Sequence, residues 1–152
     1  MKLDNITSPE LLFRAVHKET GNPIEFTIGQ VKYDKRLELV FAHVVDGKND
    51  LTPVKLSDCH KPDLWTGHVD SEGTKVFGAD VWRVYNGDRS LYEDFLIEWN
   101  REQGCWNKRW LRKPHEVSSF TARQASNGTI IGNIHNVEAL PDEVSKILSE
   151  AK

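Results

Sequence analysis

Three Asp-Gly or Asn-Gly pairs constrain this chain more than any other local feature. They are Asp46-Gly47, Asn86-Gly87 and Asn127-Gly128. Such pairs supply the positive φ angles that tight hairpin turns require. The segments around them are rich in β-branched and aromatic residues, so the chain is predicted to be mainly β. Residues 37–45 are predicted to form a central strand, because both alternating sets of their side chains contain apolar residues.

The last segment of the chain has the period of a helix. Pro141 suits a first helical position, and the acids Asp142 and Glu143 suit the positive end of the helix dipole. One stripe of the segment is apolar and consists of Leu140, Val144, Ile147, Leu148 and Ala151. This pattern predicts an amphipathic helix from about Pro141 to Ala151 that packs through this stripe.

The N-terminal segment fits two structures. Ser8 followed by Pro9, with Gly21 further on, favours a helix over residues 9–20, because these residue types start and stop helices. Leu12 to His17 is equally compatible with a strand. The local pattern leaves both alternatives open.

Three short segments of the chain together resemble one known family. The central segment runs from Trp65-Thr66-Gly67 through Asp70, Gly73 and Val76-Phe77 to Asp80-Val81, with Phe13-Arg14-Ala15 before it and Ile130 to Asn136 after it. Their order and spacing are similar to those of the YopX-like family of phage and prophage proteins. That family usually has Tyr in place of Trp65, an aliphatic residue in place of His68, and Glu-Gly in place of Gly78-Ala79.

The resemblance implies a fold and an origin. It implies a mainly β, phage-encoded protein of unsettled molecular role, and it places Phe13-Arg14-Ala15 in an extended strand. The expected fold is a small SH3-type β-barrel with an N-terminal β elaboration and a C-terminal amphipathic helix. The expected divisions are residues 1–60 for the N-terminal β region, 61–136 for the YopX-like barrel core and 137–152 for the helix, packed as one compact unit.

The residues of the family motif are predicted to serve backbone geometry. Thr66-Gly67 suits the end of a strand, and Asp70 to Gly73 suits a turn in which Asp70 caps its own backbone. Val76-Phe77 then begins the return strand. The predicted structural residues are Trp65, Thr66, Gly67, Asp70, Gly73, Phe77, Asp80, Gly132 and Asn133.

No pattern in the sequence indicates a catalytic, metal or cofactor site. The two cysteines, Cys59 and Cys105, form no CxxC pair, and the six His residues show no HxxxH spacing. The sequence also contains no nucleophile elbow and no glycine-rich phosphate loop. We therefore predict no catalytic residues, no metal ion and no cofactor, and we expect a protein that is not an enzyme.

Cationic residues are concentrated between Gly104 and His115. This stretch carries four Lys or Arg residues and no acids, so the net charge of −3 for the whole chain leaves −7 for the rest. Its indoles and cations suit the binding of an anion with a stacked base. Equally, the indoles suit a core or interface position under the Lys and Arg stems. The candidate ligand-binding residues are Trp106, Lys108, Arg109, Trp110, Arg112 and Lys113.

Length, charge and hydropathy exclude some classes of function. A chain of 152 residues with a net charge of −3 lacks the basic excess of a duplex-binding protein. No signal peptide or membrane span is apparent. We expect a cytoplasmic protein of an infected or lysogenic bacterial host, without membrane contact, that acts by protein binding or self-assembly as a homo-oligomer or with a protein partner. The alternative is binding or sequestration of a small anionic nucleotide or single-stranded nucleic acid, for example in counter-defence.

Overall fold

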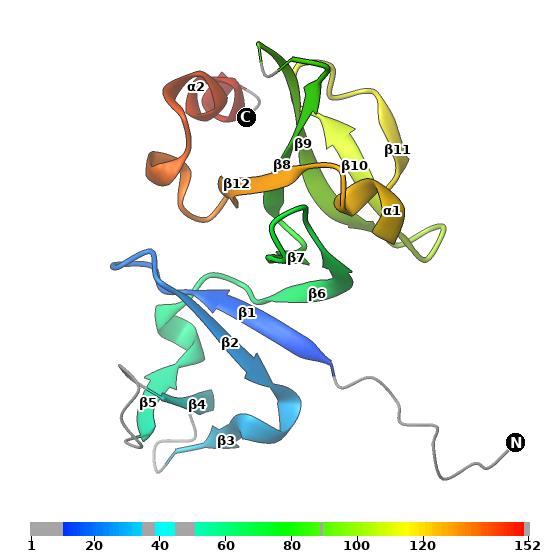
Figure 1. The fold of residues 1–152 in the computed structure, drawn as a ribbon. Helices are drawn as coiled ribbons and strands as arrows, with labels where there is room; N and C mark the ends of the chain where they lie inside the picture. Colours follow the sequence, from blue (N-terminus) through cyan, green and yellow to red (C-terminus); the bar gives the residue numbers. More distant parts are fainter. Residues whose placement is uncertain (1–10, 35–38, 45–50, 89, 151–152) are drawn as a thin grey trace, which may run out of the picture.

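The strands of the described residues form three antiparallel sheets. The computed structural model describes residues 11–34, 39–44, 51–88 and 90–150. A four-stranded and a three-stranded sheet use strands from residues 12–77, and a five-stranded sheet uses strands from residues 80–133 (Figure 1). The prediction of a mainly β protein is confirmed.

The N-terminal segment is a strand, β1 (Leu12–Val16). It lies between β2 (Pro23–Thr27) and β6 (Asp63–Val69), and β6 also pairs with β7 (Lys75–Phe77). Ala15 is fully buried and packs with Phe26 and Cys59. Burial of this face of the strand overrides the local helix signals, and the extended segment expected from the family resemblance is confirmed.

The three-stranded sheet consists of β3 (Val31–Tyr33), β4 (Leu39–Val44) and β5 (Leu51–Lys55). β4 is its middle strand, so the predicted central strand is confirmed over residues 39–44, whereas residues 37, 38 and 45 lie outside the described residues. The Asp46-Gly47 pair lies outside the described residues. The strands on either side of it, β4 and β5, pair antiparallel.

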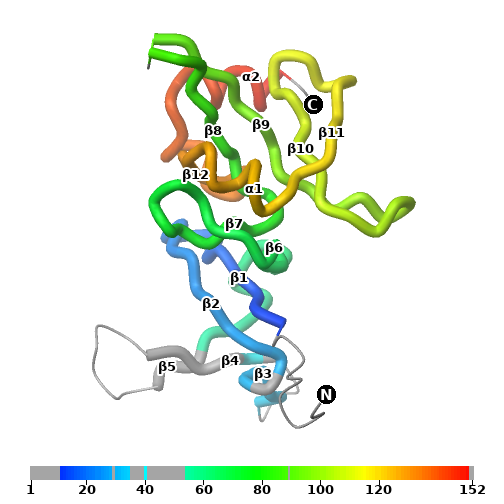
Figure 2. The backbone as a smooth tube through the Cα atoms, turned by 45° about the vertical axis from the view of Figure 1, so that its right-hand side comes forward, coloured from blue at the N-terminus to red at the C-terminus, as the bar shows by residue number. Residues whose placement is uncertain are grey.

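The five-stranded sheet holds the largest core. Its strands, in spatial order, are β11 (Val117–Ser119), β10 (Cys105–Trp110), β9 (Leu91–Asn100), β8 (Asp80–Asn86) and β12 (Thr129–Asn133). One face of the sheet buries Trp82, Phe95 and Ile97 against Val76 of β7 and Phe120. Both views place the β6–β7 hairpin between this sheet and the N-terminal strands (Figures 1 and 2).

The Asn86-Gly87 pair lies in the predicted hairpin, which joins β8 to β9. Asn86 pairs with Leu91, so the loop has four residues rather than two. Gly87 has a φ of +67°, as the sequence predicted for this position.

The hairpin predicted at Asn127-Gly128 is wrong. A short helix, α1 (Ala122–Ala125), precedes the pair, and Thr121 caps it by accepting from the backbone N–H of Gln124. Gly128 is needed for space rather than for a turn: a Cβ there would overlap the Trp82 ring and lie 2.6 Å from the Arg83 carbonyl oxygen.

The C-terminal helix is α2 (Asp142–Glu150), as predicted. Val144 is fully buried with Val81 and Leu140, and Ile147 and Leu148 pack beside them. Ala151 lies outside the described residues. The remaining helical turns are η2 (Ile28–Gln30), η3 (Leu56–Asp58) and η4 (Val137–Ala139). No helix in the described parts of the chain is long and apolar enough to cross a membrane.

The expected SH3-type barrel is not found as a closed structure in the described residues. Different strands form the two edges of each sheet: β2 and β7, β3 and β5, and β11 and β12. Strand patterns in a sequence indicate which residues are extended, but sheet closure depends on pairing between edge strands that are distant in sequence.

Candidate functional site

The β6–β7 hairpin carries the central family motif, and Asp70 organises its turn. One oxygen of the Asp70 carboxylate accepts from the backbone N–H groups of Glu72 (2.9 Å) and Thr74 (2.8 Å). The other accepts from the N–H of Ile130 at 3.0 Å. The predicted capping turn is therefore present, and the same carboxylate also ties the hairpin to β12, which the sequence did not indicate.

Two residues of β6 differ from the family pattern, Trp65 and His68, and both make contacts nearby. The strand does not end at Thr66-Gly67, so this prediction is wrong. Its pairing with β7 is irregular between Trp65 and Val69, and the strand ends at Val69. The Trp65 indole N–H donates to the carbonyl of His68 at 3.0 Å. The His68 ring packs edge-on against Phe120, and partial burial lowers the pKa of this histidine.

A buried ion pair joins β1 to β8. Nη1 of Arg14 donates to Oδ1 of Asp80 at 2.5 Å, and the two residues are only 7% and 1% exposed. The second Asp80 oxygen accepts from the backbone N–H of Phe77 at 2.8 Å, and the Arg14 guanidinium lies 4.7 Å from the Phe77 ring centre. Burial raises the pKa of Asp80 to about 6, although Arg14 opposes the rise.

A second carboxylate extends this charge cluster toward the C-terminal segment. Asp63 lies 3.4 Å from Nη2 of Arg14 and 2.9 Å from Nε2 of His135. The His135 ring stacks on His60 with 5.0 Å between ring centres. Within the described residues no group of His, Cys, Asp and Glu side chains is arranged to hold a metal ion.

The three family-like segments converge on this cluster. Arg14 comes from the first, Asp80 from the second and His135 from the third. The sequence identified all three segments as family-like but did not indicate the ion pair between Arg14 and Asp80. Each segment places an ionisable residue beside apolar ones, and this common feature was the available signal.

Ala79, beside this ion pair, has an unusual backbone. Its φ is +70°, a left-handed conformation that favours glycine, and it stands where the family usually has glycine. Its N–H donates to the carbonyl of Ile97 and its carbonyl accepts from the N–H of Ile134, so this conformation is held from both sides.

We expect Ala79→Gly to stabilise the protein. Relief of the left-handed strain outweighs the greater backbone entropy of glycine in the unfolded chain, for a net gain of about 1 kcal/mol in the free energy of unfolding. Urea denaturation measures this difference. Unchanged or lower stability would contradict the strain attributed to Ala79.

The basic aromatic stretch is divided between two faces of β10 and the loop after it. Trp106, Lys108 and Trp110 alternate along the strand and face the core of the five-stranded sheet. Trp110 lies 4.6 Å from Phe95 between ring centres, and Nζ of Lys108 lies 4.8 Å from the Phe95 centre. Burial lowers the pKa of Lys108. These three residues therefore pack against the core, as the second interpretation of the basic stretch describes.

The other three candidate residues are divided: Arg112 and Lys113 share a hollow with Trp110, whereas Arg109 lies apart from both indoles. Arg109 faces the opposite side of β10, where it pairs with Glu98 and donates to the Pro114 carbonyl at 2.6 Å. Arg112 and Lys113 are exposed after the strand. They line a small hollow that also contains Trp110, three acidic side chains and Tyr92.

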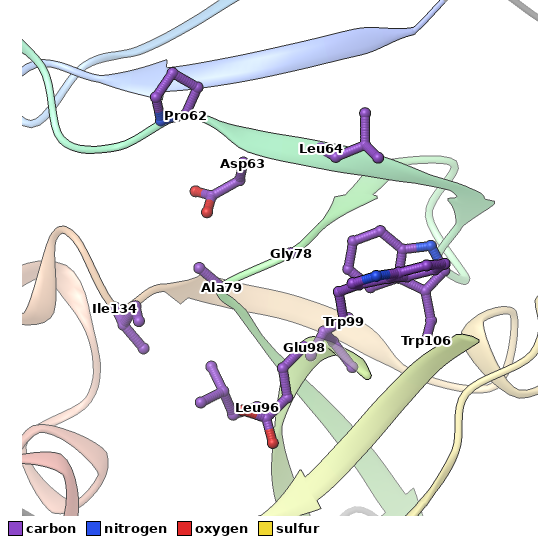
Figure 3. Close-up of a pocket in the computed structure, with 11 residues that line it drawn as sticks. Pro62, Asp63, Leu64, Gly78, Ala79, Leu96, Glu98, Trp99, Trp106 and Ile134 are labelled. Carbon is purple, nitrogen blue, oxygen red and sulfur yellow. The ribbon is translucent and has the colours of Figure 1, made fainter. Parts of the chain in front are cut away.

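A mainly apolar groove of about 370 Å³ lies between β6 and β9. Leu64 forms part of one wall, Trp99 and Trp106 form part of the other, and Gly78 and Ala79 form the floor (Figure 3). The N–H of Gly78 donates to the Leu64 carbonyl at 3.0 Å, which fixes the floor to the β6 wall.

The indole pair in this groove includes a large exposed apolar side chain. Trp99 is 49% exposed, and its ring meets Trp106 edge-on at 5.2 Å. The pairing of β8 with β9 ends at Leu96, whereas β9 continues to Asn100. Sequence reasoning identified Trp106 but not Trp99, Leu64 or the groove, because these residues meet only through tertiary contacts.

Two structural residues of the third segment, Gly132 and Asn133, lie at the end of β12. The pairing of β12 with β8 is irregular between Ile130 and Gly132. The Asn133 side-chain oxygen accepts from the backbone N–H of His135 at 3.0 Å, which holds the turn that brings His135 to Asp63.

Comparison with known proteins agrees with the three segments. The family model described as YopX protein matches residues 12–140, which is well over half of the chain. No curated protein sequence matches the chain. The matched range contains the β6–β7 hairpin, the Arg14–Asp80 ion pair and the groove between β6 and β9. The chain therefore belongs to the YopX family.

Proposed function

We propose that this protein is a phage-encoded, non-enzymatic accessory protein of the host cytoplasm that binds another polypeptide in the groove between β6 and β9. The observation that carries the proposal is Trp99, which is about half exposed in an apolar groove. Partly exposed tryptophans that line a groove are typical anchors of protein interfaces. The groove volume of about 370 Å³ also falls within the range of about 300–1,000 Å³ that is usual for ligand sites.

The shape of the groove favours an extended segment of the partner. The side chains of Glu98 and Trp99 line it at the part of β9 that has passed the end of its pairing with β8. A partner strand that runs along this edge would place alternate side chains toward the indoles. The SH3-type barrel remains part of this proposal, with the five-stranded sheet as its main component.

The nucleotide alternative has less support. Among its candidate residues, Lys108 lies over three aromatic rings and Arg109 pairs with Glu98. The exposed Arg112 and Lys113 share their hollow with Glu93, Asp94 and Glu116, whose charges oppose an anion.

A displayed library of random peptides, selected on the full chain, tests the proposal. We expect selected peptides to bind the wild type and to lose about thirtyfold in affinity with Trp99→Ala, as for removal of a tryptophan anchor. Leu91→Ala removes another exposed apolar side chain, at the far end of β9, and should leave affinity unchanged.

Two results would contradict the proposal. One is failure to select any peptide that depends on Trp99. The other is tight binding of an oligonucleotide at low salt that Arg112→Gln weakens and Trp99→Ala does not. Native mass spectrometry shows whether the groove binds a second copy of this chain. A dimer that Trp99→Ala dissociates would identify the bound polypeptide as that second copy.

A further inference from the structure

The groove between β6 and β9 lies at an open edge of the five-stranded sheet. β9 pairs with β10 as far as Asn100, but with β8 only as far as Leu96. Just beyond this end, the Ile97 carbonyl accepts from the N–H of Ala79 at 2.8 Å. Within the described residues no strand pairs with the remainder of β9 on this side, so its backbone there is open to a further strand.

The N–H and C=O of Trp99 face this open side. The backbone groups of successive strand residues point alternately to the two sides of the strand. The Asn100 carbonyl accepts from Gly104 on the β10 side. The Ile97 carbonyl accepts from Ala79 on the opposite side, and Trp99 follows Ile97 by two residues. Among the described residues no group hydrogen-bonds to the N–H or C=O of Trp99, so both are available to a partner backbone.

The groove surrounds this strand edge rather than covering one face of the sheet. Its lining includes Trp99 and Trp106 on one face of β9. It also includes Leu96 and Ile134, which pack with Val81 on the other face. Figure 3 shows Leu96 and Ile134 lying apart from the two indoles. A strand added at this edge would therefore meet apolar walls on both of its faces.

The two charged residues that line the groove have partners within the protein. Glu98 pairs with Arg109, and Asp63 pairs with Arg14 and His135. The space left to a ligand is thus bounded by apolar side chains and by an unpaired stretch of backbone. Such a lining is complementary to an uncharged, extended segment.

We propose, on the basis of the function given above, that the partner adds to β9 as a strand and presents two adjacent apolar side chains. One partner N–H donates to the Trp99 carbonyl, and one partner carbonyl accepts from the Trp99 N–H. Successive side chains of a strand point to opposite faces. One apolar side chain therefore contacts the Trp99–Trp106 pair, and the next contacts Leu96 and Ile134.

An ester scan of a peptide selected on the full chain tests the backbone pairing. An ester in place of a peptide bond removes the N–H donor with little change of shape. We expect the ester that removes the donor to the Trp99 carbonyl to weaken binding about tenfold. Esters two or more bonds away should change affinity by less than about twofold.

Amide hydrogen exchange of the protein tests the other half of the pairing. The bound peptide should slow exchange of the Trp99 amide by at least about tenfold, because its N–H becomes hydrogen-bonded. The Glu98 amide is the internal control, since Glu98 already pairs with Asn107 of β10 and its exchange should stay unchanged.

Substitutions test the two apolar contacts. The selected peptides should share two adjacent apolar residues, and Lys or Glu at either position should weaken binding by more than about tenfold. In the protein, Ile134→Ala should weaken binding about fivefold. Ile131→Ala is the matched control, because Ile131 is also partly buried beside the same core cluster but does not line the groove.

The outcomes separate this inference from the proposed function. A peptide that depends on Trp99, but tolerates an ester at every position and leaves the Trp99 amide unprotected, would overturn strand addition and leave the binding groove in place. Equal effects of Ile134→Ala and Ile131→Ala, or unchanged binding with Lys at one of the two apolar positions, would overturn the paired apolar contacts. A library that yields no peptide dependent on Trp99 would overturn both the inference and the proposed function.

Discussion

Replacement of Arg14 by Met is expected to lower the free energy of unfolding at pH 7 by about 3 to 5 kcal/mol. The substitution keeps most of the side-chain volume but leaves the Asp80 carboxyl group, which is 1% exposed, without its counter-charge. Removal of one partner of a buried pair costs more than the pair itself contributes, because the remaining charge stays desolvated. Urea denaturation with matched slopes gives the difference.

The pH dependence of this loss has a definite sign. The pKa of Asp80 rises from its ordinary value of 3.8 to about 6 in the folded wild type, so this group's contribution to stability falls as the pH rises from about 4 to about 6. Without Arg14 the pKa rises further, and the fall extends to higher pH. The cost of Arg14→Met should therefore be smaller at pH 5 than at pH 7.

Two further variants control the Arg14 experiment. Arg14→Met combined with Asp80→Asn should recover about 2 kcal/mol relative to Arg14→Met, because the amide oxygen still accepts from Phe77 without a buried charge. Arg101→Met, at an exposed turn, should change stability by less than about 0.5 kcal/mol. A loss that is independent of pH and unaffected by Asp80→Asn would show that Arg14 acts by packing alone.

Replacement of Gly128 by Ala is expected to cost about 3 kcal/mol. The new Cβ would lie 2.6 Å from the Arg83 carbonyl oxygen and would overlap the Trp82 ring, which is 2% exposed in the main core. Neither neighbour can move without a shift of β8 or of the core. Asn127→Ala changes the exposed neighbour and should cost less than about 0.5 kcal/mol.

A second substitution shows whether steric overlap causes the loss. Of the two indole atoms that the new Cβ meets, Cζ2 has no counterpart in phenylalanine, so Gly128→Ala should cost less in a Trp82→Phe background than in the wild type. Thermal unfolding of the four proteins gives the coupling. Additive losses would contradict the steric account and would favour a backbone effect at residue 128.

Local patterns predicted the elements whose stability is largely local or periodic. The helix at Asp142–Glu150 follows from its acids and apolar stripe, and the turn at Asp70 follows from side-chain capping of the backbone. The hairpin prediction at Asn127-Gly128 was wrong because the same dipeptide can serve either a hairpin turn or a close packing contact. The contact of Gly128 with the Trp82 ring, which is distant in sequence, distinguishes the two roles. Closure of the sheets could not be predicted, because it depends on the pairing of distant strands.

The candidate site depends even more on tertiary contacts. The sequence indicated Trp106 and Trp110 because cations surround them, but their neighbours in the chain do not show which indole is buried. Trp110 packs on Phe95, whereas Trp106 meets the exposed Trp99 across paired strands and borders a groove completed by β6. Charge clustering in a sequence located the stretch but not the surface that a partner can reach.

The most direct test of the binding groove is a heteronuclear NMR titration of the wild type with a selected peptide. The indole N–H resonances report separately on the groove and on the basic stretch, because Trp99 and Trp106 line the groove and Trp110 does not. We expect the Trp99 and Trp106 resonances to shift and to show intermolecular contacts with the peptide, while that of Trp110 stays in place. Shifts confined to Trp110 and the side chains of Arg112 and Lys113 would contradict the account.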